Sequence, residues 1–331
     1  MSAISTALSP NIERDDIFLA LRLLFKPTKW KEGEAIKELE NDFKGYLGVE
    51  HAFSFNSGRS ALFAILEALG IKEGEQILLQ AFTCSAAVIP ILAKKLKPIF
   101  VDIDESLNID PEDLKKKITP QTKAVMVQHT FGCPAKMDEI LKICQENNLF
   151  LIEDCAHCLG ASFKGKLCGT FGEAAFFSFG RDKVISSVFG GIAVTNNERI
   201  GRKIKEVQEN APYPSAYWIF QQLLHPLLTK GLVLPFYSLN QYLGKGLLVF
   251  FQRALILSKA VLKKEKRGIF EKEFVKKMPQ ALAFLAQNQL RKLERFKKHR
   301  QEIARLYQKE LSGLNCFSPF SKIGKEREII Y

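Results

Sequence analysis

Short apolar segments alternate with amphipathic stretches from about residue 50 to residue 200. The apolar runs predict buried strands, and the stretches between them, with apolar residues at helical spacing, predict helices. Because strands that alternate with helices usually form a parallel sheet, the pattern predicts an α/β fold. The expected strands are Ala52–Phe55, Gln76–Gln80, Pro98–Val101, Ala124–Gln128, Phe150–Ile152, Ala174–Ser178 and Ile192–Thr195, and the expected helices are Ser60–Leu69, Ala86–Lys95, Pro111–Ile118 and Met137–Asn147.

The pattern changes at Pro212 and Pro214, which interrupt the chain. The stretch Tyr217–Leu257 is rich in Leu, Phe, Tyr and Val, but it lacks the roughly 18 clean apolar residues of a membrane-spanning helix, so we expect two or three short apolar helices. A basic run, Lys259–Arg267, follows, and helical periodicity returns over Gln280–Leu311. The chain is therefore expected to divide into a large domain (1–210), an apolar and basic helical insertion (211–270) and a small C-terminal domain (271–331).

Composition narrows the class of protein. A net charge of +12 favours an anionic partner, such as a nucleotide-sugar, a phospholipid surface or a nucleic acid. No basic motif interleaved with aromatic residues is present, so a nucleic acid is not expected. Seven cysteines without a regular framework indicate a reducing compartment, and the first residues lack the pattern of a signal peptide. We therefore expect a cytoplasmic protein.

Most of the residues that could take part in a reaction lie between Phe150 and Gly191. A strand runs into the carboxylates Glu153 and Asp154, and further along Ser178 ends a strand five positions before Lys183. Together with upstream elements, this order resembles the DegT/DnrJ/EryC1/StrS family of sugar aminotransferases that use pyridoxal 5'-phosphate (PLP). The resemblance covers about residues 10–205 and 278–312, and its upstream elements are His51–Leu62, Gln80–Leu92, Lys97–Asp104 and Val127–Ile140.

The resemblance implies a fold-type I PLP architecture: a large domain with a mixed, mainly parallel sheet between helices, and a small C-terminal domain that looks truncated here. It also implies transfer of an amino group, from glutamate by family habit, to a nucleotide-linked keto-sugar in cell-surface polysaccharide or amino-sugar biosynthesis. Family members are homodimers in which a partner segment helps to bind phosphate. The corresponding segment here, Val275–Met278, lacks the family's Asn and has Lys277 in place of its Arg.

Two residues would carry the reaction. Lys183 would link covalently to PLP and then move a proton, and a lysine here separates the chain from relatives that have histidine and perform dehydration. Asp154 would stabilise a protonated pyridine nitrogen, since an opposite charge favours the charged form. The alternatives are a solvated surface lysine and an exposed loop acid.

Other residues would bind the cofactor. Gly58, Arg59 and Ser60 open a helix directly after a strand, where free N–H groups attract phosphate, although Ser60 could be a simple N-cap. The resemblance adds Ser178 as a phosphate ligand and His157 as a partner of the cofactor's phenolic oxygen, with a core histidine as the alternative. Cys84 stands where many members place an aromatic ring over the cofactor, and His129 ends another strand near the same expected pocket.

Three alternatives stay open. Cys155, His157 and Cys158 form a cluster that zinc could use, with Cys133 and Cys168 nearby, but small buried cysteines fit better and no metal is expected. The departures from the family pattern at Arg59, Cys84 and the missing Asn also allow a non-catalytic relative with a regulatory or scaffolding role.

Residues 217–267 contain Trp218, Phe220, Tyr237 and flanking lysines. They could contact a membrane peripherally, which would place the protein at the inner face of the membrane, or they could form an extra helical layer in the dimer.

Overall fold

The computed structural model describes residues 5, 8–259, 274–311 and 327–329. Most of the basic run Lys259–Arg267 and the segment Cys316–Phe320 lie outside these residues.

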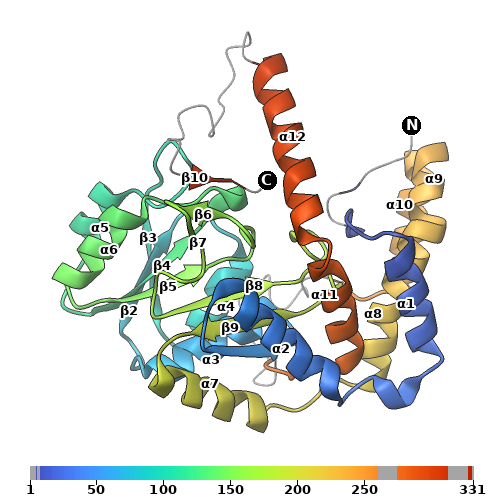
Figure 1. Cartoon of the computed structure of the whole chain (residues 1–331), viewed down its shortest axis with the longest axis horizontal. Coiled ribbons are helices and arrows are strands. Elements are labelled where there is room, and N and C mark those ends of the chain that lie inside the picture. The colour runs from blue at the N-terminus through green and yellow to red at the C-terminus, as the bar shows by residue number, and fades with distance from the viewer. Residues whose placement is uncertain (1–4, 6–7, 260–273, 312–326, 330–331) are drawn as a thin grey trace.

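A seven-stranded sheet in the order β1-β9-β8-β5-β4-β2-β3 forms the centre of the molecule (Figure 1). Neighbouring strands are parallel except that β9 is antiparallel to both β1 and β8, so the sheet is mixed and mainly parallel, as expected. The strands are β1 (His51–Phe55), β2 (Gln76–Gln80), β3 (Lys97–Val101), β4 (Thr122–Gln128), β5 (Phe150–Asp154), β8 (Ala174–Ser178) and β9 (Gly191–Thr195).

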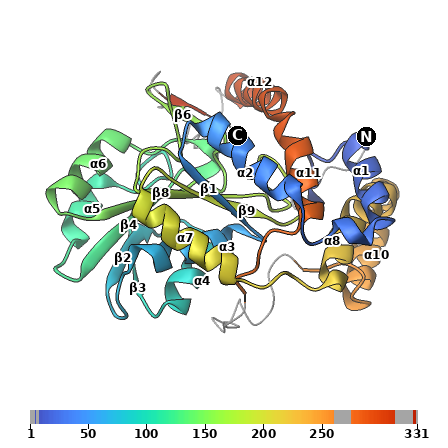
Figure 2. The ribbon, with the colours of Figure 1, turned by 60° about the horizontal axis from the view of Figure 1, so that its bottom comes forward.

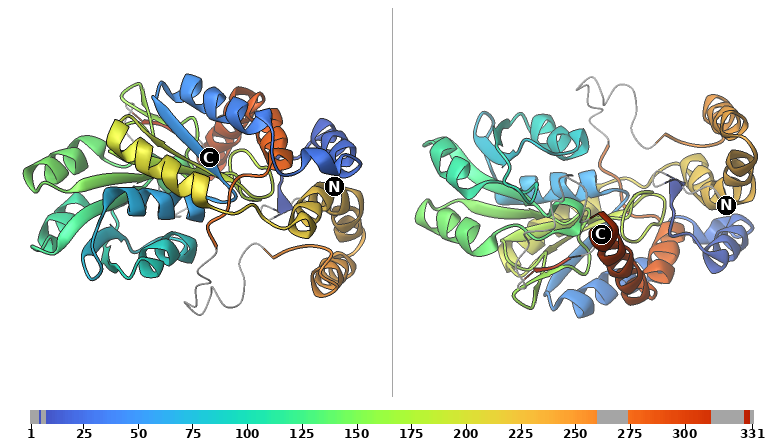
Figure 3. Two further views of the ribbon diagram at one scale, coloured as in Figure 1. Left: turned by 90° about the horizontal axis from the view of Figure 1, so that it is seen from below. Right: turned by 90° about the horizontal axis from the view of Figure 1, so that it is seen from above.

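Helices cover both faces of this sheet (Figures 2 and 3). One apolar core joins the sheet to α3, α4 and α7, and two cores on the other face join it to α5 and α6 and to α1, α2, α8 and α11. The helices are α1 (Arg14–Leu24), η2 (Pro27–Lys29), α2 (Glu34–Leu47), α3 (Gly58–Leu69), α4 (Ser85–Ala93), α5 (Pro111–Lys117), η3 (Thr130–Gly132), α6 (Met137–Glu146), α7 (Glu198–Asn210), α11 (Gln280–Leu290) and α12 (Leu293–Leu311).

The seven strands and four helices expected between residues 50 and 200 are confirmed, with ends that differ by at most two residues. Two strands of two residues each were missed: β6 (Ser162–Phe163) and β7 (Lys166–Leu167). They form a second sheet with β10 (Arg327–Glu328), in the order β10-β6-β7. Met278 and the buried face of α11 share a core with β8 and β9, so this part of the chain packs into the main body. The division into three parts stays a prediction.

The expected apolar helices of the insertion are present as α8 (Ala216–Leu228), a π-helical turn η4 (Thr229–Val233), α9 (Leu234–Leu239) and α10 (Gln241–Arg253). The first three are continuous, and α10 turns back after Asn240 to pack against α9 and η4. Among the described residues, no helix is both long and apolar enough to cross a bilayer.

Candidate active site

A cavity of about 380 Å³ opens where β5 and β8 end and α3 begins. In open α/β sheets, ligands bind outside the carboxyl ends of the strands, which is where this cavity lies. Seven of the eight predicted site residues line it: Gly58, Arg59, Cys84, Asp154, His157, Ser178 and Lys183. Side chains separated by more than 120 positions in the sequence therefore share one pocket.

The last residue of β5, Asp154, is buried, and its Oδ1 accepts a hydrogen bond from the Ala156 amide at 3.0 Å. Burial raises the pKa of this carboxyl, while the charge of Lys183 acts in the opposite direction. A carboxylate that has lost its water gains from a cationic ligand, because the pair offsets the cost of burying one charge. The exposed loop acid considered as an alternative is excluded by this placement.

Lys183 and His157 are in direct contact. The Lys183 ammonium donates to His157 Nε2 at 2.9 Å and to Asp182 Oδ2 at 3.2 Å. Burial and the neighbouring ammonium lower the pKa of His157 to about 4, so its ring is neutral at pH 7 and carries its proton on Nδ1. That Nδ1 is buried and has no partner among the described residues, which leaves a donor for a bound oxygen.

The start of α3 approaches the strands closely. Ser57 is the N-cap, and its Oγ accepts from the Ser60 amide at 3.3 Å. A Cβ on Gly191 would lie 2.4 Å from the Gly58 nitrogen, so the packing requires glycine there; a Cβ on Gly58 would lie 3.0 Å from Ser178 Cβ, which is a tight contact. The first N–H groups of a helix lack intrahelical partners, and together with its dipole they attract anions.

Ser60 is placed differently from the other predicted residues. It is fully buried, it is not the N-cap, and it does not line the cavity. Its hydroxyl donates to Asn56 Oδ1 at 2.7 Å. In this structure Ser60 therefore stabilises the turn into α3, and its own contact with a ligand stays a prediction.

Cys84 is exposed at the N-cap of α4 and lines the cavity. Two aromatic rings that the sequence did not indicate lie next to His157: Phe131 stacks on its ring with centroids 5.9 Å apart, and Phe82 meets Phe131 edge to face. Phe131 has a positive φ of 49°, a strained backbone that no sequence pattern indicated. These rings place aromatic surface beside the histidine, although Cys84 itself has none.

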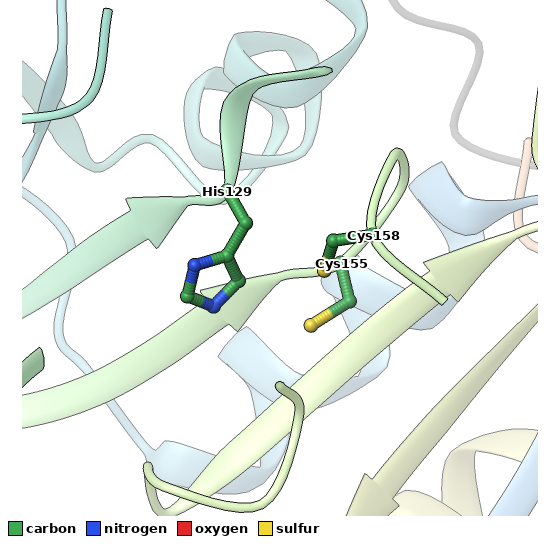
Figure 4. Close-up of side chains that lie close together, drawn as sticks. All are labelled: His129, Cys155 and Cys158. Carbon is green, nitrogen blue, oxygen red and sulfur yellow. The ribbon is translucent and has the colours of Figure 1, made fainter. Parts of the chain in front are cut away.

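His129 lies beside Cys155 and Cys158, and the three ligand atoms lie within 4.8 Å of one another (Figure 4). The histidine expected in a cysteine cluster was His157, which instead contacts Lys183. His129 Nδ1 accepts from the Ala135 amide at 3.2 Å, so the ring carries its proton on Nε2 and donates it to Glu153 Oε2 at 3.1 Å. These bonds satisfy both ring nitrogens without an ion. His129, whose place relative to the pocket the sequence left open, is fully buried and does not line the cavity.

Arg181 is a cavity-lining residue that the sequence reading missed. It is buried, its guanidinium lies over the Phe189 ring at 5.3 Å, and it donates to the Ser258 carbonyl at 3.0 Å and the Ser258 hydroxyl at 2.7 Å. The only sequence signal was an arginine between Ser178 and Lys183.

The segment Val275–Met278, expected to serve a partner subunit, lies beside the entry to α3 of its own chain, where the Asn56 amide donates to the Lys276 carbonyl at 3.1 Å.

The model of the DegT/DnrJ/EryC1/StrS aminotransferase family matches residues 11–217 and 252–328. The chain belongs to this family. It is 32% identical to an uncharacterized protein of Methanocaldococcus jannaschii over 85% of this chain and 63% of that protein. It is 39% identical to a GDP-perosamine synthase of Vibrio cholerae over 51% of this chain and 46% of the synthase. The chain thus spans about half to two thirds of the length of these curated relatives.

Solved structures of an aminotransferase and of a sugar dehydratase share the fold. The aminotransferase TlmJ of Streptoalloteichus hindustanus superposes with a TM-score of 0.73 at 22% identity, covering 99% of this chain and 77% of TlmJ. An Escherichia coli GDP-4-keto-6-deoxy-D-mannose-3-dehydratase, solved with hydrated PLP, superposes with a TM-score of 0.69 at 24% identity, covering 94% of this chain and 74% of the dehydratase. The fold-type I architecture expected from the sequence is confirmed.

The family's aminotransferases depend on PLP, and the residues of this cavity fit that group. PLP needs an amine, an anion beside its ring nitrogen, a donor for its phenolic oxygen and a phosphate site. Lys183, Asp154, His157 with its unpartnered Nδ1, and the start of α3 beside Ser178 provide groups of these four kinds around one cavity.

Proposed function

We propose that the protein is a PLP-dependent aminotransferase that moves an amino group from an amino acid, glutamate, to the ketone of a nucleotide-linked sugar. The observation that carries the proposal is that the Lys183 amine and the buried Asp154 carboxylate line the same cavity. Membership of the family supports the reaction type, and relatives named GDP-perosamine synthase support a sugar acceptor. The net charge of +12 favours an anionic substrate such as a nucleotide-sugar.

Bound PLP would supply an electron-withdrawing ring conjugated to the reacting carbon. Asp154 would keep the ring nitrogen protonated, because it is a buried carboxylate that forms no ion pair with a cationic side chain among the described residues. Lys183 would hold the cofactor and carry a proton to and from the substrate carbon. Neutral His157 would donate Nδ1–H to the phenolic oxygen, and the start of α3 with Ser178 would bind the phosphate.

The role of Lys183 is testable without knowing the sugar. Protein incubated with PLP should gain a visible absorbance band, and borohydride should fix one pyridoxyl group on the peptide that contains Lys183, as read by mass spectrometry. Lys183→Ala should show neither, whereas Lys164→Ala, which changes an exposed lysine outside the cavity, should behave as the wild type. Wild-type protein that stays colourless and unmodified would favour a non-catalytic relative.

The acceptor can then be sought with glutamate as donor and a panel of GDP-, UDP- and dTDP-linked keto-sugars, following 2-oxoglutarate. We propose a GDP-linked sugar as the first acceptor to try, since the relatives that support it carry GDP in their names. A homodimer and a polysaccharide or amino-sugar pathway, both supported by the family resemblance, complete the proposal, together with a cytoplasmic location, which the scattered cysteines support. Analytical ultracentrifugation checks the dimer.

A further inference from the structure

The solvent-facing side of α10 carries large apolar residues beside basic ones. Gly244 and Phe251 are buried against the rest of the insertion, and a Cβ on Gly244 would lie 2.6 Å from the Tyr237 nitrogen, so this face is fixed inward. At 100° per residue, Tyr242 and Val249 lie on the opposite side of the helix. A helix on the surface of a globular protein normally turns its polar side to water. The outward side of α10 therefore lacks the pattern of a helix that faces only water.

The turn between α9 and α10 adds to this surface. Leu239, at the end of α9, is 78% exposed, and Tyr242 and Leu243 at the start of α10 are 74% and 56% exposed. The hairpin lies at the end of the molecule opposite α5 and α6 (Figures 1 and 3). We call the exposed apolar residues of the turn and of α10 the hairpin surface; its members are Leu239, Tyr242, Leu243, Val249 and Phe250.

The charged side chains of the insertion itself have one sign. Residues 211–259 contain no Asp or Glu, and they contain four basic residues, whereas the whole chain is 25% charged and contains 36 acidic residues. Lys245 and Arg253 are exposed on α10 itself. Apolar and aromatic side chains flanked by cations on one helix fit the boundary between lipid headgroups and acyl chains.

The hairpin is also an addition to the family's common body. The family model leaves residues 218–251 unmatched. The α8 part of this segment packs into the main core, whereas Val233, Leu234 and Phe251 form a small core of their own with Leu8 and Leu257. The exposed residues are therefore not required by the shared fold, and the exposed side needs its own explanation.

We propose that the hairpin surface binds an anionic phospholipid surface, lying in the headgroup region with α10 parallel to the membrane plane. None of the described helices could span a bilayer, so the contact is peripheral. Apolar burial contributes most of the affinity, and the cations supply an electrostatic part that weakens when salt shortens the Debye length. The inference does not depend on the aminotransferase reaction.

Vesicle co-sedimentation of the whole protein tests the proposal, with phosphatidylcholine vesicles compared with vesicles containing phosphatidylglycerol. The wild type should bind the anionic vesicles, and less at high salt. The double variant Tyr242→Ser/Leu243→Ser should lose about tenfold or more in partition coefficient, since two apolar side chains stay in water. The matched control is Leu306→Ser/Tyr307→Ser on α12, where the same residue types are 57% and 63% exposed; it should bind like the wild type.

The same samples are measured by analytical ultracentrifugation and by circular dichroism. Absence of wild-type binding to anionic vesicles would overturn the proposal, as would equal losses in the two double variants. If the Tyr242/Leu243 variant instead lowers the oligomeric state while vesicle binding is absent, the hairpin surface contacts a second copy of the chain and the lipid proposal fails. Labelling of Lys183 by PLP reports separately on the proposed function.

Discussion

Replacing Glu153 with Gln should strongly destabilise the protein although the two side chains have nearly the same shape. Glu153 is fully buried. Its Oε1 accepts from the Phe171 and Gly172 amides at 2.7 and 2.9 Å, and its Oε2 accepts from the Gly169 amide at 2.8 Å and lies 3.1 Å from His129 Nε2. One carboxylate therefore holds both the loop at 169–172, which leads into β8, and one histidine.

A Gln side chain has one acceptor oxygen. In either orientation its NH₂ group must face two of these four donors. His129 cannot relieve the conflict by moving its proton, because its Nδ1 accepts from the Ala135 amide. A buried donor without an acceptor costs about 1–3 kcal/mol, so two cost about 2–6 kcal/mol, a large share of the roughly 5–15 kcal/mol by which proteins of this kind are stable.

Urea unfolding followed by tryptophan fluorescence measures this loss. The control is Glu139→Gln on α6, an exposed position that should change the free energy of unfolding by no more than about 0.5 kcal/mol. Burial alone would raise the pKa of Glu153, but hydrogen bonds from His129 and the loop amides hold it below its ordinary value of 4.5. The stabilisation is therefore complete above pH 4.5 and lost as the pH falls below it. A Glu153→Gln protein as stable as the control would refute the reasoning.

Two further predictions concern the cavity. Asp154→Asn should raise the free energy of unfolding of the protein without cofactor, because burying the charged carboxylate is costly, as the raised pKa of Asp154 shows. The same change should weaken PLP binding by about tenfold or more, as measured by absorbance titration. Tighter PLP binding would contradict the role of the carboxylate. His157 stays neutral down to about pH 4 in the folded protein but protonates near pH 6.5 in the unfolded chain, so the free energy of unfolding falls as the pH is lowered from 6.5 to 4. In His157→Gln the free energy of unfolding should fall less over this range. Urea unfolding across that range checks it, and an unchanged slope would show that His157 titrates normally.

Periodicity identified the strands well because burial on both faces leaves a continuous apolar run, and this signal is local. The same signal does not separate neighbouring polar residues at a strand end. Glu153 and Asp154 are adjacent, but alternation along β5 turns one toward the loop at 169–172 and the other into the cavity. The resemblance to a family, and not the hydrophobic pattern, indicated that Asp154 is the carboxylate that faces the cavity.

The histidines show a similar limit. His157 lies in sequence between Cys155 and Cys158, yet it points to Lys183, while His129, from β4's end, lies beside the cysteines. Such contacts are decided by which strands are neighbours and by the turn after β5, neither of which spacing reveals. The two-residue strands β6 and β7 could not be seen either, because two residues have no period, and β10, which pairs with β6, is distant in the chain.

The insertion could be recognised by its composition, but its connection to the cavity could not. Arg181 lines the cavity and donates to Ser258, and the Ser258 hydroxyl in turn donates to Gln222 of α8 at 2.9 Å. A buried guanidinium needs such acceptors, since an unpaired charge in the interior is costly. Removing residues 217–257 would therefore disturb a wall of the cavity as well as the hairpin surface. Single side-chain changes on α10 leave the Arg181 contacts in place, so they alone can separate lipid binding from catalysis.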